Sequence, residues 1–257
     1  MSPVLLLEHP HPGVALLRLN RPAVLNALNL ELRRALATHI TQLDADPEVK
    51  AIVLAGSDKA FCAGADLGEY VDATPAELMA RRHDLLWGAL AQCRKPLIAA
   101  VRGHALGGGC ELALHADLII AGESARFGQP EVKVGIMPGG GATQRLTRTL
   151  GKHAAIQILL WGEPISAQQA LNWRLVAEVL PDADTEARAI ALASALCQMP
   201  SVALRLLKES VLAALETPLS AGLEYERQAF QACFATEDKH EGMRARLDKR
   251  PAQFKGR

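Results

Sequence analysis

The sequence predicts a mixed α/β fold that becomes mainly helical toward the C-terminus. The chain has 257 residues, 49% of them hydrophobic and 22% charged, which is the composition of a globular protein with a large buried core. In the first half, short apolar runs bounded by turn residues alternate with longer helical stretches, the pattern of an α/β layout. From about residue 167 onward the strand pattern fades and helical stretches dominate.

Four runs in the first half have the length and composition of buried strands. They lie at 14–19, 51–55, 97–101 and 118–121. The longer stretches 30–44 and 77–92 lie between them and are expected to be helices. Strands and helices therefore alternate along the first half of the chain.

The C-terminal third is expected to consist of helices. Ser166 followed by Gln169 is typical of a capping box at a helix start, and long helix-prone stretches follow at 185–199 and 204–215. In the tail, 237–257, Lys and Arg outnumber the acidic residues. A helical region of this kind suits either a lid over a site or an assembly surface, and both readings stay open.

Charge and cysteine content exclude several classes of protein. Lys plus Arg and Asp plus Glu number 28 each, so no global positive field attracts nucleic acid. The five cysteines form an odd set without CxxC spacing, which indicates small buried residues in a reducing compartment. None of the eight histidines lies in a metal-binding frame, so no metal site is expected.

The sequence lacks targeting signals and the signatures of several other enzyme classes. No apolar run has the length of a membrane span, and the first residues lack the basic lead of a signal peptide. We therefore expect a cytoplasmic protein with neither a membrane nor a nucleic-acid partner. No GxSxG elbow and no nucleotide-phosphate loop occur.

The most informative stretch is KPLIAAVRGHALGGGCELAL, residues 95–114, in which a buried strand leads into Gly107, Gly108 and Gly109 before a helix carrying Glu111. Glycines let a backbone approach a ligand closely, and free N–H groups at a helix start favour negative charge. Such groups stabilise a developing oxyanion, and the helix dipole favours the ionised form of Glu111. Taken alone, the pattern is also compatible with a tight turn followed by a favourable cap.

Two further stretches complete the candidate site. AFCAGADL, residues 60–67, contains a small-residue turn that could supply a second N–H donor or simply allow close packing. Glu131 follows Pro130 in an apolar loop, where burial would raise its pKa. A neutral carboxyl beside an ionised one gives a single site both an acid and a base. A solvent-exposed turn residue is the alternative for Glu131.

In combination, these motifs resemble the crotonase, or enoyl-CoA hydratase/isomerase, superfamily. The matching pieces are RPAVLNAL, AFCAGADL, ALGGGCEL, FGQPEVKVGIMPGGGATQRL and LDKRPAQFKGR. The resemblance covers nearly the whole chain. It implies a crotonase (ClpP/crotonase-like) spiral of ββα units over 1–195, followed by a helical region, 196–257, that packs homotrimers, commonly paired into homohexamers.

The resemblance also implies the chemistry, namely hydration of an enoyl-CoA. Backbone N–H groups of Ala65 and Gly108 form the oxyanion hole for the thioester carbonyl. Glu111 orients and deprotonates the attacking water, and Glu131 protonates the α-carbon. Coenzyme A is part of the substrate, so no cofactor is needed.

The expected CoA contacts, in addition to the oxyanion hole, are Val24, Ala63, Asp66 and Leu67, with Lys249 near the nucleotide phosphates. Within the superfamily, the pair of glutamates favours hydration. The rivals are an isomerase on the same scaffold and a non-catalytic or RNA-binding relative. Some segments look most like bacterial enzymes of phenylacetate breakdown that hydrate 2,3-dehydroadipyl-CoA, although hydratases of fatty-acid oxidation share much of this.

Three positions depart from the family pattern. Gly68 stands where many relatives have a phosphate-binding Lys. Ala142 replaces a glycine, which would cost about 1–2 kcal/mol if that position required a positive φ. Arg174 replaces a glycine at a helix end, so that end is expected to close differently.

Overall fold

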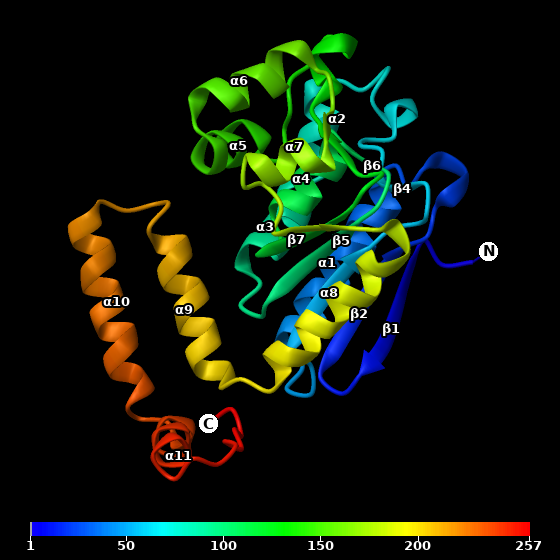
Figure 1. The fold of residues 1–257 in the computed structure, drawn as a ribbon. Helices are drawn as coiled ribbons and strands as arrows, with labels where there is room; N and C mark the ends of the chain where they lie inside the picture. Colours follow the sequence, from blue (N-terminus) through cyan, green and yellow to red (C-terminus); the bar gives the residue numbers. More distant parts are fainter. Residues whose placement is uncertain (1) are drawn as a thin grey trace.

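The computed structural model describes residues 2–257 and contains two sheets (Figure 1). The larger sheet has the order β1 (Leu5–His11), β2 (Val14–Leu19), β3 (Ala51–Ala55), β5 (Leu97–Val101), β7 (Leu118–Gly122) and β10 (Glu178–Leu180). The smaller has the order β4 (Ala60–Cys62), β6 (His104–Leu106), β8 (Arg126–Gly128) and β9 (Ile165–Ser166). Only the β1–β2 and β8–β9 pairs are antiparallel. The other neighbouring strands in both sheets are parallel.

The chain places one strand in each sheet on every turn of a spiral. β3 is followed by β4, β5 by β6, and β7 by β8, and helices separate these pairs. The helices are α1 (Leu30–Ala45), α2 (Pro75–Ala80), α3 (Asp84–Gln92), α4 (Gly108–Leu114), α5 (Ala142–Leu150) and α6 (Lys152–Trp161). This repeated ββα path confirms the predicted fold.

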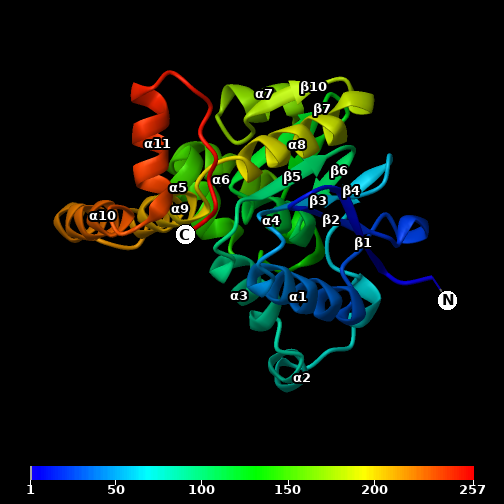
Figure 2. The same ribbon diagram turned by 90° about the horizontal axis from the view of Figure 1, so that it is seen from below.

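Both faces of the larger sheet are buried, which explains why its central strands are continuous apolar runs. In β3, Ile52 and Leu54 face the core between the sheets, whereas Val53 belongs to the second core. α8 (Asp182–Cys197) covers that second core with Ala189 and other small residues. Figure 2 shows α1 and α3 side by side, away from α8.

The prediction of one helix at 77–92 is wrong in one respect, because the structure has two helices there. Thr74 forms a capping box with Glu77 and starts α2 at Pro75, earlier than expected. The backbone of Arg82 then adopts φ 51, in the left-handed region, so α2 cannot run into α3. The break lets 67–83 fold as a segment separate from α3.

Helix starts elsewhere follow local capping. The Ser166 hydroxyl accepts from the Gln169 N–H (3.2 Å) at the start of α7 (Ala167–Asn172), as predicted. The long helices α8 and α9 (Ser201–Ala213) each begin three residues before the predicted start. Both follow a proline, Pro181 and Pro200 respectively, which lies just before the first helical residue.

The structure answers the question about Ala142 and corrects the expectation about Arg174. Ala142 is the first residue of α5, and the positive φ falls on Gly141 (107°), so Ala142 is not strained. Arg174 adopts φ 62 itself, and Leu175 N–H bonds the Ala170 carbonyl (2.8 Å). α7 therefore ends with a left-handed residue, as it would with glycine, but here that residue is arginine.

Replacing Arg174 by glycine is expected to stabilise the fold by up to about 1 kcal/mol. Glycine adopts a positive φ without the strain of an L side chain, and this gain is expected to exceed the entropy that glycine adds to the unfolded chain. No side-chain hydrogen bond is lost, because Arg174 is exposed and makes none among residues 2–257. Urea unfolding of both proteins at one concentration measures the difference. A loss of stability would mean that the arginine itself contributes.

The C-terminal helices leave the core. α9 and α10 (Leu219–Cys233) lie side by side and project from the sheets, and α11 (Glu237–Leu247) follows (Figure 1). The tail returns along α11, where the buried Asp238 carboxylate accepts from the N–H groups of Lys255 (2.6 Å) and Gly256 (2.8 Å). The expected boundary after residue 195 falls in the last turn of α8 and stays a prediction.

The described chain, 2–257, has no single helix long and apolar enough to cross a membrane, although α8 and α9, bent by 113°, pass that test as a pair. All five cysteines are free. Cys62, Cys93, Cys110 and Cys197 are buried, as predicted, and Cys233 is half-buried. Burial raises the pKa of both Cys62 and Cys110 to about 12, so neither thiol is reactive at neutral pH.

Candidate active site

The candidate site lies where β4 and β6 end. Gly107, with φ 50, turns the chain from β6 into α4, whose first residue is Gly108. A Cβ built on Gly108 would lie 3.8 Å from the Ala65 nitrogen, so the two backbones are neighbours. Within residues 2–257, neither the Ala65 nor the Gly108 N–H donates a hydrogen bond to the protein. Two unpaired N–H groups side by side suit a developing negative charge.

Leu28 pairs with the segment that carries Ala65. Its N–H donates to the Gly64 carbonyl (2.7 Å), and its carbonyl accepts from Asp66 N–H (3.2 Å), which leaves the intervening Ala65 N–H turned away. The Leu28 side chain also packs against Gly108, where an added Cβ would lie 3.2 Å from its Cδ1. One residue therefore contacts both candidate donors.

The segment before Leu28 is itself hydrogen-bonded to β4. Asn26 is fully buried and lies in the left-handed region (φ 58). Its amide donates to the carbonyls of Ala60 (3.0 Å) and Phe61 (3.2 Å) and accepts from Arg21 N–H (2.8 Å). The RPAVLNAL motif thus supports the loop that carries Ala65.

Glu111 lies in the first turns of α4 and is 3% exposed. Its Oε1 accepts from the N–H groups of Gly140 (2.6 Å) and Ala142 (3.0 Å). Burial nevertheless raises the pKa of Glu111, and these two hydrogen bonds only partly oppose that effect. The expectation that the helix dipole favours the ionised form of Glu111 stays a prediction, and burial acts in the opposite direction.

Glu131 lies in the short helix η3 (Pro130–Val134), next to Gly107 at the start of α4. A Cβ added to Gly107 would lie 2.6 Å from the Glu131 Oε1. Burial raises the pKa of Glu131 to about 7, and the charge of nearby Glu111 acts in the same direction. The alternative of a solvent-exposed turn residue is excluded, since Glu131 is partly buried beside Glu111.

Several residues that position the two glutamates were not found from the sequence. Gln129 is fully buried, and in the amide orientation that satisfies its contacts it donates to both Glu131 oxygens (3.2 and 3.1 Å). Nδ1 of His115, one helical turn after Glu111, donates to the Glu111 carbonyl (2.8 Å), and the His115 ring stacks on Trp87. Burial lowers the pKa of His115 to about 4, so it is neutral. The i to i+4 spacing from Glu111 was the one available signal for His115.

The predicted CoA contacts fall into two groups. Val24 and Leu67 are exposed apolar residues, and Ala63 and Asp66 flank the loop that carries Ala65. Asp66 also pairs with Arg21 (3.1 Å). Lys249 is elsewhere. It follows α11, which Figure 1 shows at the opposite end of the molecule from β4 and β6.

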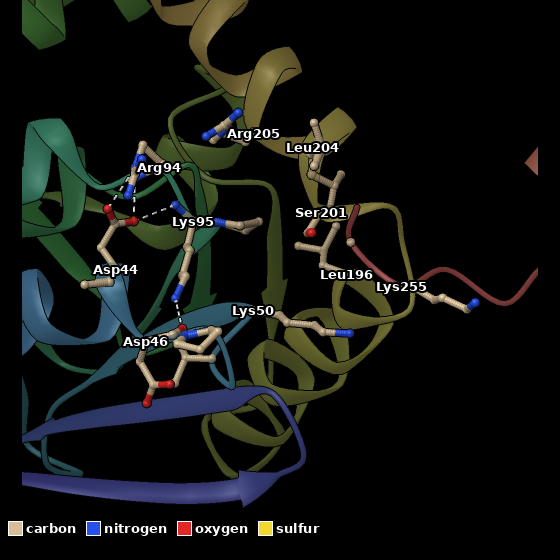
Figure 3. A pocket seen from close by; sticks show the side chains of 16 residues that line it. Asp44, Asp46, Lys50, Arg94, Lys95, Leu196, Ser201, Leu204, Arg205 and Lys255 are labelled. Atoms are coloured by element: carbon tan, nitrogen blue, oxygen red, sulfur yellow. Dashed lines mark hydrogen bonds and ion pairs between the residues drawn. The ribbon is translucent and has the colours of Figure 1, made fainter. Parts of the chain in front are cut away.

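Two hollows lie apart from the predicted CoA contacts. One, of about 820 Å³, separates α9 from the core and adjoins Glu111, because Gly140, whose N–H binds the Glu111 carboxylate, lines it together with Trp87 and His115. The other, of about 370 Å³, lies where β3 and β5 begin (Figure 3). In it, Asp44 accepts from the Arg94 and Lys95 backbones, and the Lys95 ammonium donates to backbone carbonyls. Asp44 also forms an ion pair with the Arg94 side chain (3.1 Å). Among residues 2–257, no three His, Cys, Asp or Glu side chains are grouped where they could hold a metal ion.

Comparison with known proteins identifies the family. The model of the enoyl-CoA hydratase/isomerase family matches residues 10–257. The chain is 47% identical over 241 residues to a "probable enoyl-CoA hydratase" of Mycobacterium bovis, covering 94% of each protein. It is 46% identical over 244 residues to the 2,3-dehydroadipyl-CoA hydratase of Escherichia coli, covering 95% of this chain and 96% of that one.

The solved structures agree with the sequences. The crystal structure of an enoyl-CoA hydratase subunit I from Geobacillus kaustophilus superposes with a TM-score of 0.96 at 40% identity, covering 99% of this chain and 98% of that one. Together with the family match over nearly the whole length, this shows that the chain belongs to the enoyl-CoA hydratase/isomerase family.

Proposed function

We propose that the protein is an enoyl-CoA hydratase that adds water across the trans-2 double bond to give a 3-hydroxyacyl-CoA. One observation carries the proposal. Two carboxyl groups with raised pKa values, Glu111 and Glu131, flank the start of α4, where the N–H groups of Ala65 and Gly108 are unpaired. An acid, a base and an oxyanion hole are the groups that addition of water to a conjugated thioester requires.

Glu111 is the water-activating base in this proposal. Its Oε1 is held by two backbone N–H groups, and Oε2 accepts no hydrogen bond from residues 2–257. Oε2 can therefore orient a water and take its proton as the oxygen attacks the β-carbon. The thioester carbonyl, bound by Ala65 and Gly108, carries the enolate charge that this attack creates.

Glu131 is the proton donor. With a pKa of about 7 it retains its proton in a large share of molecules at neutral pH, and it delivers that proton to the α-carbon. The two carboxyl groups influence each other, so the protons belong to the pair as much as to either residue.

Coenzyme A enters as part of the substrate. Exposed Val24 and Leu67 offer apolar surface to it, beside Ala63 and Asp66 at the loop carrying Ala65. Lys249 follows α11, which lies at the opposite end of the molecule from β4 and β6 (Figure 1). Its proposed phosphate contact therefore requires a second copy, whose C-terminal region reaches the site.

Assembly into homotrimers, or hexamers made of two trimers, is part of the same proposal. Large apolar side chains are exposed on the projecting helices α9 and α10, namely Leu207, Val211, Leu219, Leu223 and Phe230. A monomer would leave this surface in water. Light scattering on the purified protein checks the number of chains, and a monomer at micromolar concentration would contradict it.

The test is the loss of enoyl-thioester absorbance from crotonyl-CoA, with the product identified by its mass. A product heavier by one water supports a hydratase. Conversion of a 3-enoyl-CoA to the 2-enoyl isomer without water addition would instead make the protein an isomerase. No turnover of either substrate would overturn the proposal, unless 2,3-dehydroadipyl-CoA, the substrate in the name of the Escherichia coli relative, is hydrated.

The pH dependence of kcat/KM is expected to be bell-shaped. The rate falls as pH rises through about 7, because Glu131 must be protonated to donate. It falls again at lower pH, because Glu111 must be ionised to accept and its pKa is raised by burial. Steady-state assays across about pH 5 to 9 measure both limbs. In Glu131→Gln the residual activity should lack the alkaline limb, and a limb unchanged in that variant would assign it to another group.

A further inference from the structure

A buried arginine lies behind the oxyanion loop. Arg33, on α1, is 5% exposed, and one guanidinium nitrogen, Nη2, donates to the Leu28 carbonyl. Its Nη1 lies 2.6 Å from Nε2 of His83. No carboxylate of the described chain, 2–257, forms an ion pair with it. A buried cation is costly unless hydrogen bonds satisfy it, and here the Leu28 carbonyl and His83 provide them.

The Leu28 carbonyl connects Arg33 to the oxyanion hole. The same oxygen accepts from Asp66 N–H (3.2 Å), and Leu28 N–H donates to the Gly64 carbonyl (2.7 Å). These two bonds fix the orientation of the intervening Ala65 N–H. Since the Leu28 side chain also packs on Gly108, a shift of Leu28 would move both donors.

His83 connects Arg33 to a different part of the chain. Arg33 can only donate, so Nε2 of His83 must accept and the ring proton lies on Nδ1, 3.5 Å from the Tyr70 hydroxyl. The guanidinium also lies 5.2 Å from the centre of the Tyr70 ring. Tyr70 and His83 lie near the two ends of the segment 67–83, which precedes α3 and its Trp87.

The segment 67–83 is otherwise loosely covered. Val71 and Met79 are each 78% exposed, and α2 buries none of its residues. The Glu69 carboxylate accepts from Leu30 N–H (3.0 Å), and Arg81 donates to the Glu69 carbonyl (2.5 Å). The Arg33–His83 contact joins the last residue of the segment directly to α1.

We propose that Arg33 is a positioning residue that ties the segment 67–83 to the oxyanion hole through Leu28. Order in this segment, which lies next to the site, is thereby coupled to the alignment of the Ala65 and Gly108 donors. The inference rests on the proposed hydratase function, because it assigns those donors to the thioester carbonyl. In this mechanism, a substrate that orders 67–83 when it binds also aligns the Ala65 and Gly108 N–H groups.

The first test compares Arg33→Met with Arg34→Met. Met keeps an apolar stem in place of the guanidinium, and the neighbouring Arg34 is exposed on the same helix. With crotonyl-CoA, kcat of Arg33→Met should fall roughly 10- to 100-fold, since misalignment of a donor costs rate rather than ground-state binding. Arg34→Met should match the wild type. A lower melting temperature with kcat within about twofold of wild type would reduce Arg33 to a structural residue.

The second test concerns the coupling. His83→Gln keeps an acceptor for Arg33 and should retain most activity, whereas His83→Leu should lose it. The double variant Arg33→Met/His83→Leu should lose no more activity than Arg33→Met alone, because both changes break the same connection. Additive losses would mean that the two residues act separately, and the proposal would be wrong.

The third test does not depend on turnover. In Arg33→Met, hydrogen exchange should accelerate both in peptides covering 63–66 and in those covering 67–83, with Arg34→Met unchanged. Acceleration in only one region would overturn the coupling. If the wild type failed to hydrate any enoyl-CoA while exchange in both regions rose together, the proposed function would fail and the connection through Arg33 would stand.

Discussion

Replacing Glu111 or Glu131 by glutamine is expected to lower kcat by roughly 10²- to 10⁴-fold, because in the proposed mechanism each replacement removes a group that transfers a proton in the transition state. Glutamine has nearly the same shape as glutamate. Its amide oxygen at position 111 can still accept from Gly140 and Ala142, whose N–H groups bind the carboxylate now. The loss should therefore appear in kcat without unfolding the protein.

The assay uses crotonyl-CoA and follows wild type beside both variants. Glu31→Gln is the matched control, since Glu31 is exposed on α1 and lies outside the site. Thermal unfolding measured on the same samples separates chemistry from stability. Full activity in either variant would show that two carboxyl groups are not both needed, and the mechanism argued above would be wrong.

Gly109→Ala is expected to produce the second largest effect, with kcat falling roughly 10²- to 10³-fold, comparable to loss of one oxyanion donor. A Cβ at this position would overlap the carbonyl oxygen of Cys62 and lie 2.7 Å from its Cβ. Since one of those atoms belongs to the backbone, α4 must move away from β4. That movement separates Gly108 from Ala65. Overpacking of this kind also destabilises a fold by about 1–3 kcal/mol.

Gly88→Ala provides the matched control for that substitution. Gly88 lies inside α3, and a Cβ there would meet nothing within 4 Å. Alanine at such a position should leave kcat unchanged and stabilise the helix by about 0.5–1 kcal/mol. If Gly109→Ala retained the wild-type kcat, the spacing of β4 and α4 would not control the oxyanion hole.

The sequence predicted the central strands well because their environment is uniform. β3 and β5 are buried on both faces, so each is an unbroken apolar run that can be recognised locally. The break between α2 and α3 was missed, because the left-handed backbone of Arg82 has no signature in the residue type. Arg174 was misread for the same reason.

The site was predicted less completely than the strands. The pairing of Ala65 with Gly108 came from family resemblance, since no local pattern brings two segments 43 residues apart together. The preference of Glu111 for the ionised form was predicted from the helix that carries it. Burial and the N–H groups of Gly140 and Ala142, about 30 residues further along the chain, also act on its pKa. Only a three-dimensional arrangement supplies those partners.

Gly140 is one of these partners, and its crowded surroundings constrain how this protein can diverge. A Cβ at position 140 would collide with the Trp87 ring and lie 2.6 Å from the Glu111 Oε2. While either neighbour remains, a Cβ at position 140 collides with it, so glycine fits and alanine does not. A chain in which both Glu111 and Trp87 were replaced by small residues would have room for a side chain at position 140. That side chain would then occupy the space that the Glu111 carboxylate and the Trp87 ring need. The residue at position 140 therefore indicates whether a relative of this chain can still accommodate a glutamate at position 111.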